Sequence, residues 1–138
     1  MKLFIDANVL ITVLNKELNH FAECARILSL ADKRRYELVT SPMCLAISFH
    51  FAQKKSGEAM AKNKIAILLQ RFSISDNDKR DVIKVLENTK IHDFEDGLEY
   101  YSAFSSRCKC IITNDVNDFY FSEIEVIKPK DFLVKYVL

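Results

Sequence analysis

The chain has 138 residues and a formal net charge of +1, and 49% of its residues are hydrophobic. These values suit a single folded domain, residues 1–138, and exclude an intrinsically disordered chain. Only two Gly and two Pro are present, which disfavours an all-β protein with many tight turns, and the balanced charge lacks the strongly basic footprint of a typical nucleic-acid binder.

Short apolar strands alternate with helices along the whole chain. Strands are expected at residues 2–6 and 36–41, within the stretch 108–115, and at the start of the stretches 73–88 and 125–138. Helices are expected over residues 7–16, 19–35, 42–55 and 56–72, from Asp93 onward, and in the later parts of the stretches 73–88 and 125–138. The helix over 42–55 begins with Ser41 as cap and Pro42 in its first turn, and its apolar residues on several sides predict that much of it is buried.

This alternation predicts an α/β fold with a mostly parallel central sheet. In such folds, ligands bind beyond the carboxyl ends of the strands. Two acids occupy positions of this kind. Asp6 ends the first strand, and Asp115 follows the apolar run CIIT. The pattern therefore predicts that both carboxylates lie at one edge of the sheet.

Four more acids crowd into the segment 90–104, KIHDFEDGLEYYSAF. Asp93 is expected to cap the helix that follows it, and Glu95 is expected to face solvent. Asp96 lies in the first turn, with Glu99 one turn later, so Asp96 can point at the end of the sheet while an apolar stripe packs against it.

Convergence of Asp6, Asp96 and Asp115 predicts a cation site. Carboxylates that share a site raise one another's pKa, and a divalent cation removes that repulsion. Mg²⁺ and Mn²⁺ prefer oxygen ligands of this kind. Each acid alone has a simpler interpretation, as a cap, a turn residue or a surface residue near a helix N-terminus, so the prediction depends on all three meeting.

Three sequence stretches, FIDANVLI, DFEDGLEYYSA and IITNDVNDF, resemble the PIN domain family in their order and separation. The chain looks like the small single-domain toxins of bacterial VapBC toxin–antitoxin pairs. The resemblance implies a three-layer α/β/α sandwich and a ribonuclease that hydrolyses RNA with Mg²⁺ or Mn²⁺. It also implies a cytoplasmic protein with an antitoxin partner and a homodimeric assembly.

The same resemblance assigns roles to individual residues. Asp6, Asp96 and Asp115 take the places of catalytic, metal-binding acids. The residues in supporting places are Asn8, Thr113, Asn114 and Asp118.

One acid that the family usually carries is missing. No carboxylate lies between Glu37 and Glu58, and the corresponding position falls near Ile47 or Ser48. Ser48 would be a weak ligand at most, and Glu99 is the candidate that could compensate. Fewer carboxylates leave less negative charge to hold a cation.

The missing acid keeps a second hypothesis open, a PIN-like module that binds RNA or a partner protein without cleaving. An apolar groove could then receive a partner helix. Its candidate lining residues are Met43, Leu45, Ile47, Phe49 and Phe51. A phosphorylated receiver domain fits less well, because the acids occur in the wrong order and no clear Lys follows a late strand.

The four cysteines show no metal-ligand or redox spacing, since Cys108 and Cys110 are separated by one residue. We expect them to be reduced and mostly core-filling, as in a cytosolic protein. The N-terminus lacks the apolar run of a signal peptide.

A ribonuclease of this kind would also need positive charge near its substrate. The cations that we expect to follow an RNA backbone are Lys54, Lys55, Lys62, Lys64, Arg71 and Arg107.

Overall fold

The computed structural model describes residues 1–138, and it has a central parallel sheet in the strand order β3-β2-β1-β4-β5. The strands are β1 (Lys2–Ile5), β2 (Glu37–Thr40), β3 (Ser73–Ile74), β4 (Cys110–Ile112) and β5 (Glu125–Ile127). Every pairing is parallel, which confirms the α/β fold with a parallel sheet.

Seven α-helices connect and cover these strands. They are α1 (Ala7–Leu14), α2 (Phe21–Ser29), α3 (Pro42–Ser56), α4 (Glu58–Leu69), α5 (Lys79–Glu87), α6 (Phe94–Ser105) and α7 (Pro129–Phe132). Short 3₁₀ turns follow α2 and precede β5, and a π-helical turn, Leu133–Val137, extends α7.

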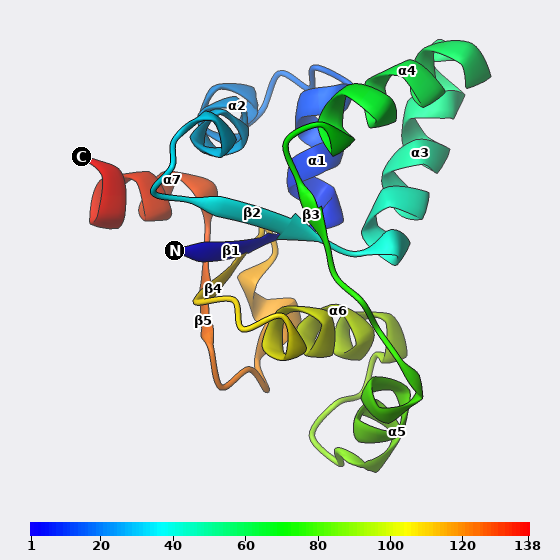
Figure 1. Cartoon of the computed structure of the whole chain (residues 1–138), viewed down its shortest axis with the longest axis vertical. Coiled ribbons are helices and arrows are strands. Elements are labelled where there is room, and N and C mark those ends of the chain that lie inside the picture. The colour runs from blue at the N-terminus through cyan, green and yellow to red at the C-terminus, as the bar shows by residue number, and fades with distance from the viewer.

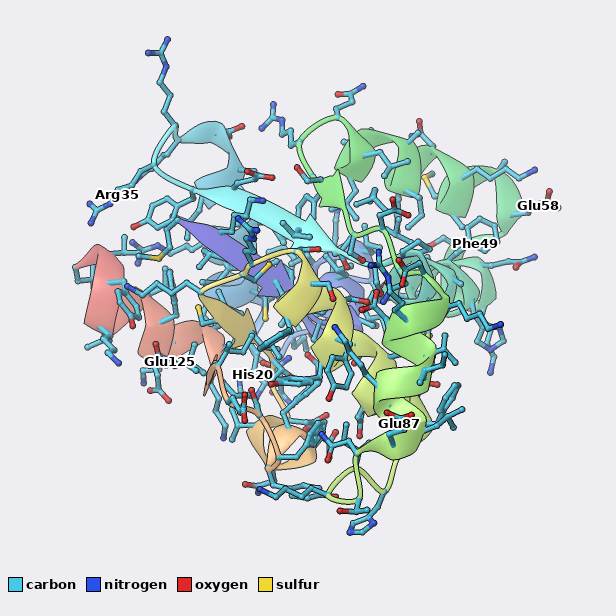
Figure 2. The ribbon with its side chains drawn as sticks, turned by 60° about the horizontal axis from the view of Figure 1, so that its bottom comes forward. His20, Arg35, Phe49, Glu58, Glu87 and Glu125 are labelled. Carbon is cyan, nitrogen blue, oxygen red and sulfur yellow. The ribbon has the colours of Figure 1, made fainter.

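The helices form two layers, as the three-layer prediction requires. Figure 1 shows α1, α2, α3 and α4 on one side of the sheet, with α6 on the other side and α5 packed outside α6. Figure 2 shows side chains filling the spaces between these layers, while Arg35 and Glu58 extend outward from the rim. The sheet therefore lies in the middle of an α/β/α sandwich.

The central strands are apolar on both faces because helices cover both. Leu3, Phe4 and Ile5 of β1 and Ile111 and Ile112 of β4 are fully buried. The four cysteines are also buried and unpaired, which confirms their assignment as free thiols. None of the helices is both long and apolar enough to cross a lipid bilayer.

Local signals in the sequence set several helix boundaries. Ser41 caps α3 by accepting a hydrogen bond from the Cys44 backbone amide at 3.0 Å, with Pro42 in the first turn. Asp78 and Asp81 form a reciprocal capping box at the start of α5. Gly57, with φ of +86°, separates α3 from α4.

The expectation that much of α3 is buried is wrong. Only Cys44, Ser48 and Ala52 of this helix are fully buried, and Phe51 is 44% exposed. The physical reason is that α3 lies at the outside of its layer, where α1 and α4 cover only part of its circumference. Its other apolar side chains are half-buried or reach the surface.

Candidate metal centre

An acidic cavity of about 180 Å³ opens at the carboxyl edge of β1 and β4. These strands are adjacent and parallel, so the residues that follow them emerge on the same side. The polar lining residues are Asp6, Asn8, Glu95, Asp96, Glu99, Asp115 and Asp118, and the remaining ones are Ala7, Ile11 and Ile47. The three predicted acids therefore meet in space, although 109 positions separate Asp6 from Asp115 in the sequence.

Asp6 is held in one orientation by the backbone and by neighbouring side chains. It caps α1, and its Oδ1 accepts a hydrogen bond from the Ala7 amide at 2.6 Å. Its Oδ2 accepts from the Thr113 hydroxyl at 2.8 Å. Asp6 is only 7% exposed, so its carboxylate is fixed before any ligand arrives.

The Asn8 side chain links the two strand-end acids. Its amide nitrogen lies 3.3 Å from Asp6 Oδ2, 3.2 Å from Asp115 Oδ2 and 3.0 Å from Thr113 Oγ1. Its side-chain oxygen accepts from the Asn114 backbone amide at 3.1 Å. Asn114 is thus engaged through its backbone, and Thr113 also accepts from the Asp115 amide at 3.1 Å. One amide group sets the spacing of two carboxylates.

The first turn of α6 brings Asp96 to the same cavity. Asp93 caps the helix and accepts a hydrogen bond from the Asp96 amide at 2.9 Å, as the sequence predicts. Partial burial, followed by the charges of Asp93 and Asp118, raises the pKa of Asp96 to about 7. Asp118 is exposed on the cavity wall, where burial and the charge of Asp115 raise its pKa as well.

Glu99 lies deeper than Asp96 and is 3% exposed. It accepts a hydrogen bond from the Cys44 thiol at 2.9 Å, and ligand atoms of Asp6, Cys44 and Glu99 all lie within 4.8 Å of one another. Burial, with the nearby charge of Asp6, raises the pKa of Glu99 to about 10. Burial also raises the pKa of Asp6 and of the Cys44 thiol. Without a cation, burial therefore favours the protonated form of Glu99.

No acid from α3 reaches the cavity, and Ile47 lines that part of its wall. Ser48 is buried and its hydroxyl donates to the Cys44 carbonyl at 2.7 Å, one turn back along the helix. Ser48 is thus outside the lining set, unlike Asp6, Asn8, Asp96, Glu99, Asp115 and Asp118. A carboxyl from α6, Glu99, and a thiol from α3, Cys44, contact each other beside Asp6.

The donor set fits a hard divalent cation. Its carboxylates come from three separate elements, no Lys, Arg or His lines the cavity, and none of the ion pairs of the structure includes them. Burial and, to a lesser degree, the repulsion of neighbouring carboxylates raise the pKa values of Asp6, Asp96 and Glu99. A bound cation with oxygen ligands would remove that cost.

Most of the cations predicted to follow an RNA backbone have partners within the protein. Lys55 and Lys64 donate to the carbonyls of Asn15 and Leu14, at the C-terminal end of α1. Lys62 pairs with Glu58, and Arg71 with Asp32. Lys55 and Lys64 therefore stabilise the C-terminal end of α1, while Lys62 and Arg71 form ion pairs at the protein surface.

One contact of the site was not predicted. Cys44 was interpreted as a core thiol and is buried, but its thiol also donates a hydrogen bond to Glu99. Glu95 is exposed, as the sequence predicts, and it also lies on the cavity rim. The available signal for Cys44 was its place in the first turn of the helix after β2, a strand whose carboxyl end lies at the same sheet edge.

The chain is similar in sequence to a known protein family and to a characterised protein. A family model described as "PIN domain" matches residues 2–117. Ribonuclease VapC1 from Aquifex aeolicus (strain VF5) is 30% identical over 138 aligned residues, which cover 95% of this chain and 92% of that protein.

Solved structures share the fold at lower identity. VapBC2 from Rickettsia felis, bound to a DNA fragment from its promoter, has a TM-score of 0.71 and 17% identity. The alignment covers 93% of this chain and 98% of that chain. VapBC-1 from nontypeable Haemophilus influenzae has a TM-score of 0.69 and 16% identity and covers 94% and 99%. VapC20 from Mycobacterium tuberculosis, a toxin that cleaves the sarcin–ricin loop, has a TM-score of 0.64 and 16% identity and covers 79% and 86%.

Proposed function

This chain belongs to the PIN domain family, and on that premise we propose that its acidic cavity hydrolyses RNA phosphodiester bonds with a divalent cation. The observation that carries the proposal is the meeting of Asp6, Asp96 and Asp115 in one cavity without a basic counter-charge. PIN-domain nucleases use divalent metal ions, and we propose Mg²⁺ or Mn²⁺ here because carboxylates make up most of the polar lining of the cavity.

Asp6, Asp96 and Asp115 would hold the cation, with Glu99 as a fourth carboxyl from the cavity floor. Bound there, a divalent cation lowers the pKa of water and offsets negative charge that develops on the phosphate. Asn8 and Thr113 fix the Asp6 and Asp115 carboxylates, so these ligands need little reorganisation. Asp118, on the rim, would contact the cation through a water molecule.

Glu99 takes the place of the family acid that α3 lacks. Its carboxyl would lose its proton when a cation binds, because the positive charge favours the ionised form. The Cys44 thiol, donating at 2.9 Å, keeps the carboxyl oriented toward Asp6. This assignment depends on side chains from α3 and α6 together, rather than on an acid within α3.

The relatives named VapBC support a role as the toxin of a toxin–antitoxin pair. The partner would then be an antitoxin protein, and the half-exposed apolar residues of α3 are candidates for that contact. We further propose a homodimer and a cytoplasmic location, where RNA substrates of this class occur.

A purified-protein assay with a mixed RNA pool tests the catalytic proposal. We expect cleavage that requires Mg²⁺ or Mn²⁺ and falls at least 100-fold in Asp6→Asn and Asp96→Asn, since a lost ligand weakens both the cation and its alignment. The matched control is Asp131→Asn, at an exposed acid of α7 that does not line the cavity. Equal cleavage by all four proteins would contradict the assignment.

The absence of an α3 acid favours one alternative, a PIN-like module that binds RNA or protein without cleaving. Calorimetric titration with Mn²⁺ separates the two. Binding only near the millimolar range, or none, together with inactivity on RNA, would support the binding module. Micromolar binding that Asp6→Asn removes would support the nuclease.

A further inference from the structure

An exposed aromatic pair, His92 and Tyr120, lies outside the acidic cavity. The two rings are stacked, with centroids 6.0 Å apart and planes inclined by 24°. Tyr120 is 59% exposed although its hydroxyl donates to the Lys90 carbonyl at 2.6 Å and its ring meets Phe121 edge-on at 5.3 Å. The tyrosine is therefore oriented by three neighbours while much of its ring stays open to solvent.

Both residues lie a few positions from residues that line the acidic cavity. His92 directly precedes Asp93, which caps α6 and orients Asp96. Tyr120 follows Asp118, a lining residue, by two positions. Asp93 and Asp118 are close enough for the charge of Asp93 to raise the pKa of Asp118. The aromatic pair thus lies where a polymer extending from the cavity on the α6 side would pass.

Beyond this pair, a second cavity of about 320 Å³ continues along α6. Tyr100, Tyr101, Phe104 and Phe121 contribute its aromatic wall, Lys84 and Lys90 contribute positive charge, and Glu123 is its one acid. Lys84 Nζ lies 5.9 Å from the Tyr101 ring centroid, and neither lysine is in an ion pair. Aromatic side chains beside unpaired cations are the combination with which proteins bind single-stranded nucleic acids.

We propose that His92 and Tyr120 form a stacking platform for a base next to the scissile phosphate, and that Lys84 and Lys90 receive phosphates further along. The inference rests on the proposed ribonuclease function and adds to it a base-binding subsite outside the acidic cavity. A duplex hides its base faces within the stack, whereas an unpaired strand or loop can offer one to an exposed ring. Stacking is tolerant of base identity, so the platform favours unpaired structure over a particular sequence.

The test measures binding of a fluorescein-labelled 12-nucleotide oligouridine and of a 12-base-pair RNA duplex by fluorescence anisotropy. Every protein carries Asp6→Asn to prevent cleavage, and each is compared with that parent. We expect Tyr120→Leu to raise the Kd for the single strand roughly 5- to 100-fold, the range of one stacked base. Tyr120→Phe, which keeps the ring, should stay within about twofold, and duplex binding should change little in either variant.

Phe51→Leu is the matched control, because Phe51 is also an exposed aromatic residue, 44% exposed, on the α3 side of the molecule. A single-strand Kd unchanged by Tyr120→Leu, or lowered affinity in Phe51→Leu alone, would overturn the platform. A parent that binds no single strand would overturn it too. Circular dichroism checks that each variant is folded.

Failure of the platform is distinguishable from failure of the nuclease. The unmodified chain is assayed separately with Mn²⁺ on bis(p-nitrophenyl) phosphate and on RNA, and bis(p-nitrophenyl) phosphate has no nucleobase. No hydrolysis of either compound would contradict the proposed function, whereas anisotropy alone decides the platform.

Discussion

The Glu99→Gln substitution should stabilise the metal-free protein as the pH rises. The ordinary pKa of this carboxyl is 4.5, and burial beside Asp6 raises it to about 10 in the folded protein. Below pH 4.5, folded and unfolded chains both carry the proton, so Glu99 imposes no cost. Between the two pKa values the unfolded chain releases the proton and the folded protein keeps it, so stability is lost as pH rises.

The size of this effect at pH 7 depends only on the folded pKa lying above 7. Each pH unit above 4.5 costs about 1.4 kcal/mol, which amounts to about 3 kcal/mol at neutral pH. Glutamine has nearly the same shape, does not titrate, and can accept from the Cys44 thiol while donating to Asp6. Glu99→Gln should therefore gain about 3 kcal/mol relative to the parent at pH 7, and much less at pH 5.

Urea unfolding in EDTA, repeated at pH 5.5 and 7.5, measures the difference. The gain should grow by roughly 3 kcal/mol between these two conditions. Glu95→Gln, at an exposed position of the same helix, is the control and should show no such growth. A stability difference that stays constant with pH would mean that Glu99 is ionised in the folded protein, which would refute the reasoning.

Two further predictions concern the cation site and the packing of α6. Mn²⁺ affinity should fall as pH is lowered from 8 to 6, by roughly tenfold per unit while only Glu99 must release a proton, and more steeply below the Asp96 pKa of about 7, where a second carboxyl must also release one. Calorimetry checks this, and Asp96→Asn should lose the steeper part below pH 7 while keeping the shallower one; equal affinity at both pH values in the parent would contradict it. Gly97→Ala should destabilise the fold by about 1–2 kcal/mol, because a Cβ there would lie 2.6 Å from Val85 Cγ1 and 2.9 Å from Ile91 Cγ2, and this overpacking outweighs the better helix propensity of alanine. Urea unfolding measures the loss, which Val85→Ala in the same chain should partly relieve; a fully additive double variant would show that the contact is not the cause.

The local sequence predicted the elements well where chemistry acts over a few residues. Apolar runs of strand length, Ser41 and Pro42 at the start of α3, and Asp93 at the start of α6 each act on neighbouring backbone groups, so their effects are visible in the printed sequence. The alternation of these elements was enough to predict a parallel sheet, and the parallel sheet was enough to place Asp6 and Asp115 at one edge.

Only the tertiary structure decided how the centre of the site is filled. Whether Glu99 faces solvent or Asp6 depends on the rotation of α6 against the sheet, and its contact with Cys44 joins positions separated by 55 residues. The burial of α3 was likewise mispredicted, because coverage depends on where α1 and α4 pack rather than on the composition of the helix itself. The sequence by itself determined which carboxylates reach the edge of the sheet, since strand direction follows from local patterns. Their protonation was decided by long-range packing, because desolvation depends on atoms that the chain supplies from distant segments.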